Sequence, residues 1–193
     1  MRKTIALMAS CVAVTWISAA WSQEKRDDAK PQRVAFKSDL VAEAPGEWKV
    51  KESTKPLRLL EITLPSSEKG LADGQLVITH FGKGQGGGID ANLDRWYSQM
   101  EQPDGSASAK AAKKSEIKND AAKITWVDIP GTLLDRPFPA SPDVTKRPKY
   151  RLFAAMVDGG AEGPYWIRVT GPDSVLVAHR DAFEKFLKSV AKK

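Results

Sequence analysis

Short segments of alternating apolar residues, separated by hairpin-length loops, are the feature that most limits how this chain can fold. The two clearest are Tyr150–Val157 and Pro164–Thr170, which the glycine-containing stretch 158–163 separates. A period of two is typical of a strand with one buried face, and so short a connection joins antiparallel neighbours. Further segments with strand composition are 57–64, 75–81, 115–119 and 123–134. The pattern predicts a mostly antiparallel sheet of about six strands.

Two segments have the three- and four-residue apolar spacing of amphipathic helices. The first is 89–101, and the second begins with Asp173 as its expected N-cap and ends among the C-terminal lysines. The apolar stripes are Ile89, Leu93, Trp96 and Met100 in the first segment, and Val175, His179, Phe183, Phe186, Leu187 and Val190 in the second. Two amphipathic helices covering such a sheet make an α+β fold. The polar 106–114 and the proline-rich 135–149 are predicted to be loops.

The first 22 residues have the three parts of an export signal. Arg2 and Lys3 precede the apolar stretch 5–17, and small residues follow it. Cleavage after Ala20 and cleavage after Ser22 both place small residues at the required positions, so both alternatives stay open. The apolar stretch is shorter than the roughly 20 residues that a membrane-spanning helix needs. We therefore expect a periplasmic or extracellular mature protein without a stable membrane anchor.

Cys11 is the only cysteine of the chain and lies inside the predicted signal peptide. Apolar sequence continues after it, whereas a lipidated cysteine leads into a polar tether, so we do not expect lipoprotein anchoring. The mature chain would then have no disulfide, thiol nucleophile or cysteine metal ligand. Residues 23–33 are charged and almost free of apolar side chains, which indicates a disordered spacer. The predicted globular domain is a single one, 34–193.

The formal net charge of +6 comes from 30 basic and 24 acidic residues. The lysines gather in two separate stretches, 110–118 and 185–193. A nucleic-acid interface usually has a denser basic stripe, so we expect no nucleic-acid binding. Solvated lysines, or weak attraction to an anionic partner, explain the charge better.

A glycine-rich stretch between the segments 75–81 and 89–101 is the most distinctive motif. Gly82–Gly87 matches G-x-G-x-x-G, but a dinucleotide site also needs a parallel βαβ unit, and the residues after 101 do not provide one. Free N–H groups at the start of a helix favour weak binding of an anion or a partner instead. The residues of this predicted site are His80, Lys83, Gly84, Gly86 and Gly87. A plain turn that needs glycine for its positive φ angles is the alternative.

Catalytic and metal constellations are not found in the sequence. His80 and His179 are the only histidines, and zinc needs three or four protein ligands. His179 falls within an apolar stripe, so we expect it to be packed. There is no G-x-S-x-G motif, and we predict no catalytic, cofactor or metal site. Dispersed carboxylates in a small envelope hydrolase are the alternative function.

Trp166 lies on the opposite side of its predicted strand from Tyr165 and Ile167. It therefore faces either a second layer or solvent. In the solvent case, Trp166 and Arg168 would form a surface recognition patch, since aromatic and arginine side chains dominate many interfaces.

The order of the predicted elements resembles the fold shared by the PsbP proteins of photosystem II and the nuclear-import factor Mog1. The resemblance rests on the turn and tryptophan at 45–48, the helical 92–96 and the endings 163–167 and 183–189. It implies a Mog1/PsbP-like sandwich over most of 34–193, and known members of this fold mostly bind other macromolecules. More narrowly, Phe81–Gly87 together with Trp96 resembles a group of exported proteins from planctomycete-type bacteria.

The function that we favour from the sequence is an exported, non-catalytic binding or interaction module. Its ligand would be an unidentified macromolecular or anionic partner. The binding surface would be the glycine-rich stretch or the proline-rich 135–149, because long loops on a rigid sheet commonly carry function.

Overall fold

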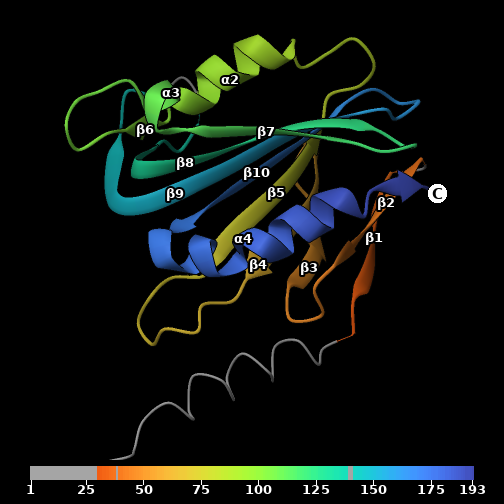
Figure 1. The fold of residues 1–193 in the computed structure, drawn as a ribbon, viewed down its shortest axis with the longest axis horizontal. Coiled ribbons are helices and arrows are strands. Elements are labelled where there is room, and N and C mark those ends of the chain that lie inside the picture. The colour runs from red at the N-terminus through yellow and green to blue at the C-terminus, as the bar shows by residue number, and fades with distance from the viewer. Residues whose placement is uncertain (1–29, 38, 139–140) are drawn as a thin grey trace, which may run out of the picture. The chain divides into compact units, whose positions relative to one another are not determined.

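Antiparallel pairing of strands organises the chain (Figure 1). The computed structural model describes residues 30–37, 39–138 and 141–193, so the predicted signal peptide and most of the predicted spacer lie outside the described residues. The larger sheet has the spatial order β3 (Lys49–Glu52), β4 (Arg58–Leu64), β5 (Gly74–His80), β10 (Tyr165–Pro172), β9 (Thr145–Asp158), β8 (Lys123–Asp135) and β6 (Met100–Glu101), and β7 (Lys113–Lys118) also pairs with β8. The smaller sheet has the order β1 (Gln32–Phe36), β2 (Leu40–Ala44) and β11 (Ala191–Lys192). Every one of these pairs is antiparallel.

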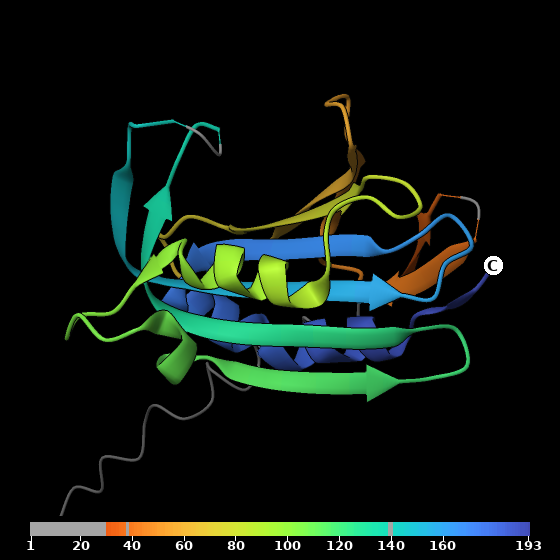
Figure 2. The same cartoon turned by 90° about the horizontal axis from the view of Figure 1, so that it is seen from above.

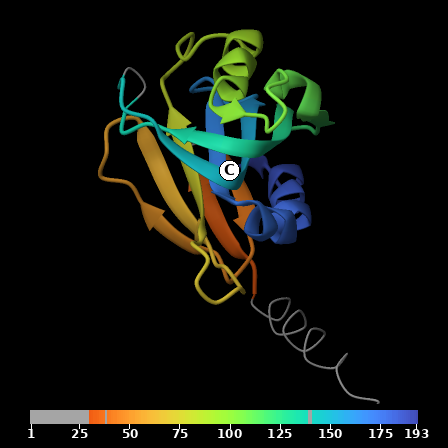
Figure 3. The same cartoon turned by 90° about the vertical axis from the view of Figure 1, so that its left-hand side faces the viewer.

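Three helices accompany the sheets in the described part of the chain: α2 (Ile89–Tyr97), α3 (Ser108–Ala111) and α4 (Asp173–Lys188). Figures 1 and 3 show α2 and α3 on one side of the larger sheet and α4 on the other, beside β1 and β2. None of the described helices is long and apolar enough to cross a membrane.

The predicted antiparallel α+β class is confirmed. The predicted numbers of elements, six strands and two helices, were too low. The described residues form an eight-stranded and a three-stranded sheet with three helices. Strands β1, β2 and β3 escaped the sequence analysis because each has only four or five residues, too few for an alternation to stand out. Strand β1 begins at Gln32, so the end of the predicted spacer belongs to the smaller sheet.

Two predicted boundaries were also wrong. The helix predicted for 89–101 ends at Tyr97, because Met100 and Glu101 pair with Leu133 and Thr132 of β8. The loop predicted for 106–114 contains α3 and the first residues of β7.

The proline-rich 135–149 and the start of the last helix also differ from prediction. Thr145 already belongs to β9, so only part of 135–149 is a loop. The ends of β8 and β9 bend away from the rest of the sheet (Figure 2). Asp173 is the first residue of α4, and Pro172 occupies the N-cap position. The Asp173 carboxylate instead accepts a hydrogen bond from Arg151.

Both faces of the central strands are buried. In β10, Tyr165, Ile167 and Val169 lie in the core between the larger sheet, α4 and the smaller sheet. Trp166 points the other way, into a second core beneath α2 that includes Leu93 and Trp96. The alternation in β10 therefore serves two layers.

Aromatic side chains fill the first core. Phe183 of α4 stacks on Phe153, with ring centroids 5.3 Å apart, and meets the edge of Trp126 at 5.7 Å. Nearby, the Trp48 indole N–H donates to Nδ1 of His179, and Nε2 of His179 lies 2.9 Å from the Pro65 carbonyl oxygen. His179 is thus a buried structural residue that satisfies both ring nitrogens within the fold.

One buried carboxylate lies on the α4 side of the sheet. Asp128 is 1% exposed, and its two oxygens face Nη1 of Arg151 at 2.5 Å and Nε of Arg180 at 3.0 Å. Arg151 also pairs with Asp173 at 2.9 Å, and the Arg180 guanidinium lies over the Trp126 ring. The network ties β8 and β9 to the first turns of α4. A buried charge is tolerated only when it is paired in this way.

We expect Asp128→Ala to lower the free energy of unfolding by about 3–5 kcal/mol, because it leaves the largely buried Arg151 without its main partner. Asp135→Ala is the matched control, since Asp135 forms an exposed pair with Arg147 and its loss should cost about 1 kcal/mol or less. Urea denaturation measures both changes. Equal effects of the two substitutions would show that the Asp128 network does not hold α4 to the sheet.

Candidate functional site

The glycine loop, 82–88, connects β5 to α2 and packs against Trp166. Gly82, Gly84, Gly86 and Gly87 all have positive φ angles, between 72° and 96°. A Cβ atom added to Gly86 would lie 2.6 Å from Nε1 of Trp166. Glycine is therefore required at position 86 for both backbone conformation and close approach.

Asn92 holds this loop from within α2. Its side-chain amide donates to the carbonyl oxygens of Gly86 and Gly88, at 2.8 and 2.9 Å. Asn92 is buried, and its own oxygen accepts from Arg95. The sequence analysis missed Asn92 because an isolated asparagine near a helix start has no distinctive pattern.

The structure separates His80 from Lys83, although the sequence places them together. Lys83 is exposed on the glycine loop. His80 is buried in the last position of β5, where its ring stacks on Tyr165 with centroids 4.7 Å apart. Its Nδ1 lies 3.2 Å from the Pro164 carbonyl oxygen, and its Nε2 has no partner among the described residues. His80 therefore packs on the α4 side of the sheet and is not part of an exposed site with Lys83.

Tyr165 and Asp39 form a partly buried hydrogen bond at this end of the sheet. The Tyr165 hydroxyl donates to the Asp39 carboxylate, which also accepts from the backbone N–H of Glu162 at 3.1 Å. Burial raises the pKa of Tyr165, and the neighbouring Asp39 carboxylate raises it further. Burial by itself would raise the pKa of Asp39, but the hydrogen bonds from Tyr165 and Glu162 outweigh it and lower that pKa. Tyr165 is thus a weakened acid and Asp39 a weakened base, which suits a structural tie between loops rather than proton transfer.

The patch predicted from Trp166 and Arg168 is not an exposed aromatic surface. Trp166 is 5% exposed because α2 covers it, and the edge of Trp96 lies against it at 6.1 Å. Arg168 is half-buried, and its Nε donates to Gln99 at 2.8 Å. Burial lowers the pKa of Arg168, and the nearby Arg58 adds to this effect.

A cavity of about 580 Å³ lies at the opposite end of β5 and β10 from the glycine loop. Its mostly apolar walls come from Leu71, Pro103, Gly131–Thr132, Pro148–Tyr150 and Pro172–Ser174. We name it the β9–α4 pocket. Its size lies within the range of roughly 300–1,000 Å³ that is usual for ligand sites.

The backbone is distorted where β8 and β9 line this pocket. The pairing register shifts between Gly131 and Leu133 of β8, so that Pro148 and Lys149 of β9 lie opposite Thr132 alone. Lys149 has a φ angle of 56°, which is uncommon for a residue with a Cβ atom. Bulges of this kind redirect side chains and are frequent beside functional sites.

Positive charge is concentrated on β9 beside the β9–α4 pocket. Lys146, Arg147 and Lys149 are all exposed there. Lys146 pairs with Glu101, and Arg147 pairs with Asp135, whereas Lys149 has no ion pair with any residue that the structure describes. The N-terminus of α4 also borders the pocket and has no side-chain cap. The rim at Lys149 is therefore suited to a negatively charged group.

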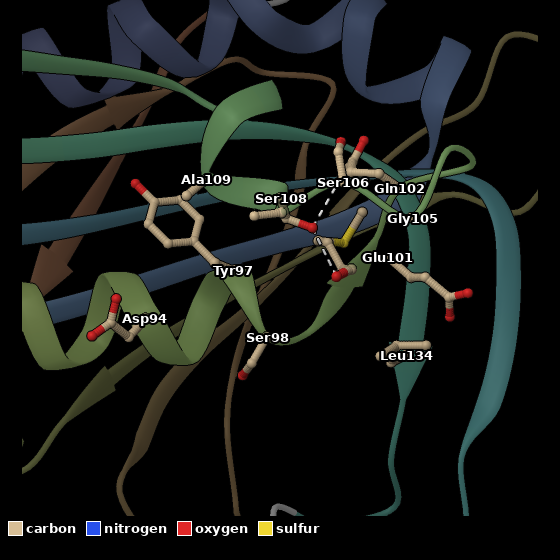
Figure 4. Close-up of a pocket in the computed structure, with 12 residues that line it drawn as sticks. Asp94, Tyr97, Ser98, Glu101, Gln102, Gly105, Ser106, Ser108, Ala109 and Leu134 are labelled. Atoms are coloured by element: carbon tan, nitrogen blue, oxygen red, sulfur yellow. Dashed lines mark hydrogen bonds between the residues drawn. The ribbon is translucent and has the colours of Figure 1, made fainter.

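A second, more open hollow of about 440 Å³ lies between the end of α2, β6 and α3 (Figure 4). The Gln102 side-chain amide donates to the Ser108 hydroxyl at 3.1 Å, and this hydroxyl donates to the Met100 carbonyl oxygen at 2.8 Å. The Tyr97 ring points toward Ala109 across the hollow. These internal bonds explain why Gln102 and Ser108 are buried, because they satisfy the Gln102 amide nitrogen and the Ser108 hydroxyl within the fold.

Carboxylates do not converge in either hollow. In Figure 4, Asp94 and Glu101 lie on opposite sides, and Glu101 pairs with Lys146 at 2.6 Å. In the β9–α4 pocket, Asp173 is bound to Arg151. Within the described ranges, no group of three or more His, Cys, Asp or Glu side chains is placed to hold a metal ion. Nothing in that part of the chain favours the hydrolase alternative.

Comparisons with known proteins give similarities of structure and none of sequence. No family model matches the chain, and no curated protein matches its sequence. The chain is similar to the solution structure of cyanobacterial PsbP (CyanoP) from Synechocystis sp. PCC 6803, with a TM-score of 0.49 and 12% identity over 96% of this chain and 99% of that one. At this level of similarity, no ligand, location or residue role is carried over to this chain. The narrower resemblance to exported planctomycete-type proteins stays a prediction.

We expect Gly86→Ala to lower the free energy of unfolding by about 2–3 kcal/mol, because the new Cβ atom meets Trp166 in addition to straining the backbone. Gly84→Ala is the control, since its φ angle is also positive but its Cβ atom would meet no neighbour within 4 Å. It should cost about 1 kcal/mol. Thermal and urea unfolding of both variants measure the difference, and identical losses would contradict a tight contact at Gly86.

We expect Tyr165→Phe to reduce the sensitivity of the fold to alkaline pH. The fold raises the pKa of Tyr165, so the stabilisation from its neutral form is complete below the ordinary tyrosine pKa of about 10 and is lost as pH rises above it. Melting temperatures between pH 8 and 11 should fall less steeply for Tyr165→Phe than for the parent protein. Parallel curves would mean that the Tyr165–Asp39 bond does not contribute.

Proposed function

We propose that this protein is an exported, non-catalytic binding module whose β9–α4 pocket receives an apolar group of a negatively charged macromolecular partner. The observation that supports this most is the mostly apolar cavity of about 580 Å³ beside the distorted strand β9. Apolar walls with a few polar groups at the rim are the usual composition of a binding site.

Lys149 is the residue that we propose to interact with the negative charge of the partner. Its backbone is held in a left-handed conformation between Pro148 and Tyr150, both of which line the pocket. A bulge maintained at a cost in backbone strain is most readily explained when the side chain it directs has a role. Together with exposed Lys146 and Arg147 on the same strand, Lys149 favours a partner that carries several negative charges.

A binding role agrees better than catalysis with the charge states of the buried groups. The Tyr165–Asp39 bond makes the tyrosine a weaker acid and the aspartate a weaker base than usual. Both carboxylate oxygens of Asp128 form ion pairs, one with Arg151 and one with Arg180. Active sites usually shift acids and bases toward neutral pKa values instead. Export is inferred from the sequence of residues 1–22 and completes the proposal.

The pocket is tested with 8-anilinonaphthalene-1-sulfonate, a probe with an apolar body and one negative charge. Amide NMR spectra should show saturable shifts at Gly131, Lys149 and Ser174. Ser174→Trp, which places a large side chain in the pocket, should abolish these shifts. Ser98→Trp, which fills the hollow of Figure 4 instead, should leave them unchanged. Shifts elsewhere, or equal effects of both variants, would overturn the assignment of the pocket.

The role of the Lys149 charge is tested by Lys149→Asn. Asparagine tolerates the left-handed conformation, so the substitution removes the ammonium group without straining the backbone. We expect probe affinity to fall about two- to fivefold, as for loss of an exposed ion pair, with an unchanged melting temperature. Lys118→Asn on β7 is the control and should have no effect. Unchanged affinity in Lys149→Asn would remove the anionic part of the proposal.

A further inference from the structure

A buried donor without an acceptor lies beneath the glycine loop. The Trp166 side chain is nineteen-twentieths buried, since the residue is 5% exposed, and its Nε1 makes no hydrogen bond within the described part of the chain. A buried indole N–H normally has a partner, and leaving it unsatisfied costs about 1–3 kcal/mol. Such a group calls for an explanation, and a role in binding an ion is one of the usual ones.

The unsatisfied N–H faces Gly86. The Cβ position of Gly86 would be 2.6 Å from Nε1, so the indole edge points directly at the underside of the loop. Gly86 carries no side chain, so its backbone lies directly against this donor, with the Phe81 ring beside it. Any residue other than glycine would close that approach.

Further donors belong to the glycine loop itself and to the start of the helix that follows it. Helix α2 has nine residues, and its N-cap, Gly88, offers no side-chain bond to the N–H groups of the first turn. The first N–H with a helical acceptor is that of Asn92, which reaches the Gly88 carbonyl oxygen. Lys83 adds an exposed ammonium on the same loop. Asp90, also in the first turn, opposes an anion and limits its affinity.

We propose that the glycine loop is a site for a small oxyanion, a phosphate, sulfate or carboxylate group. The donors are Trp166 Nε1, the first N–H groups of α2 and the Lys83 ammonium. A change in the backbone of Gly86, which glycine permits at little cost, brings the anion to the indole. The site is separate from the β9–α4 pocket, because it lies at the other end of β5 and β10.

The site is tested by titrating the full chain with inorganic phosphate at constant ionic strength and following the indole N–H resonances by NMR. Trp166→Phe assigns the signal by its loss. We expect the Trp166 resonance to shift saturably with phosphate, whereas those of Trp48, Trp96 and Trp126 stay in place. No shift at Trp166, or equal shifts of every indole, would overturn the proposal.

Substitution of exposed lysines keeps one part of the test independent of folding. Lys83→Ala should weaken phosphate binding about two- to fivefold, with an unchanged melting temperature, and Lys118→Ala should not. Trp166→Phe should weaken it about tenfold or more, as expected for loss of a hydrogen bond to a charged group. Phosphate affinity that is unaffected by both Lys83→Ala and Trp166→Phe would contradict a site at the glycine loop.

The oxyanion could belong to a lipid headgroup or to a soluble molecule. A second experiment, co-sedimentation with phosphatidylglycerol vesicles, distinguishes the two sources. Co-sedimentation that Lys83→Ala reduces assigns the site to a lipid headgroup, and phosphate binding without co-sedimentation assigns it to a soluble oxyanion. Ser174→Trp should leave both readouts unchanged, so failure of this site and failure of the β9–α4 pocket are observed separately.

Discussion

Burial of both faces of β8, β9 and β10 is the constraint on which the rest of the structure depends. Alternate residues of these strands enter two different cores, one beneath α4 and the smaller sheet and one beneath α2. A polar side chain in these strands must therefore find a partner inside the protein, as Asp128 does with two arginines. The same network fixes α4 against β8 and β9, so packing of the first core and pairing of the buried charge are inseparable.

Both candidate sites lie where the chain leaves this doubly covered region. At one end of β5 and β10, the glycine loop passes over Trp166 and continues into α2. At the other end, the bulge opposite Thr132 and the N-terminus of α4 border the β9–α4 pocket. The rigid centre holds these irregular ends in place, which allows a loop or a bulge to keep a conformation that it would not keep alone.

The sequence predicted the elements whose alternation is long and regular, and much less of the sites. Strands β4, β5, β9 and β10 follow from their apolar period, and the buried stripe of α4 follows from its spacing. Met100 continued the apolar stripe of α2, but pairing with β8 decided its conformation. His80 and Lys83 are near in sequence, yet the pleat of β5 turns the His80 ring toward the α4 side of the sheet, where it stacks on Tyr165. The left-handed Lys149 has no sequence signal at all, because its conformation arises from the register shift between two strands.

Strand β7 forms one exposed border of the larger sheet, and five of its six residues are exposed. An open border of this kind offers unpaired backbone groups to any neighbouring extended chain. Lys113, Lys114 and Lys118 place three ammonium groups along it. Two copies that approached border to border would bring these charges together, and their mutual repulsion disfavours stacking into fibres. This protection matters most for a protein without cysteine cross-links in its folded part, where transient opening of the outermost strand is restrained only by packing.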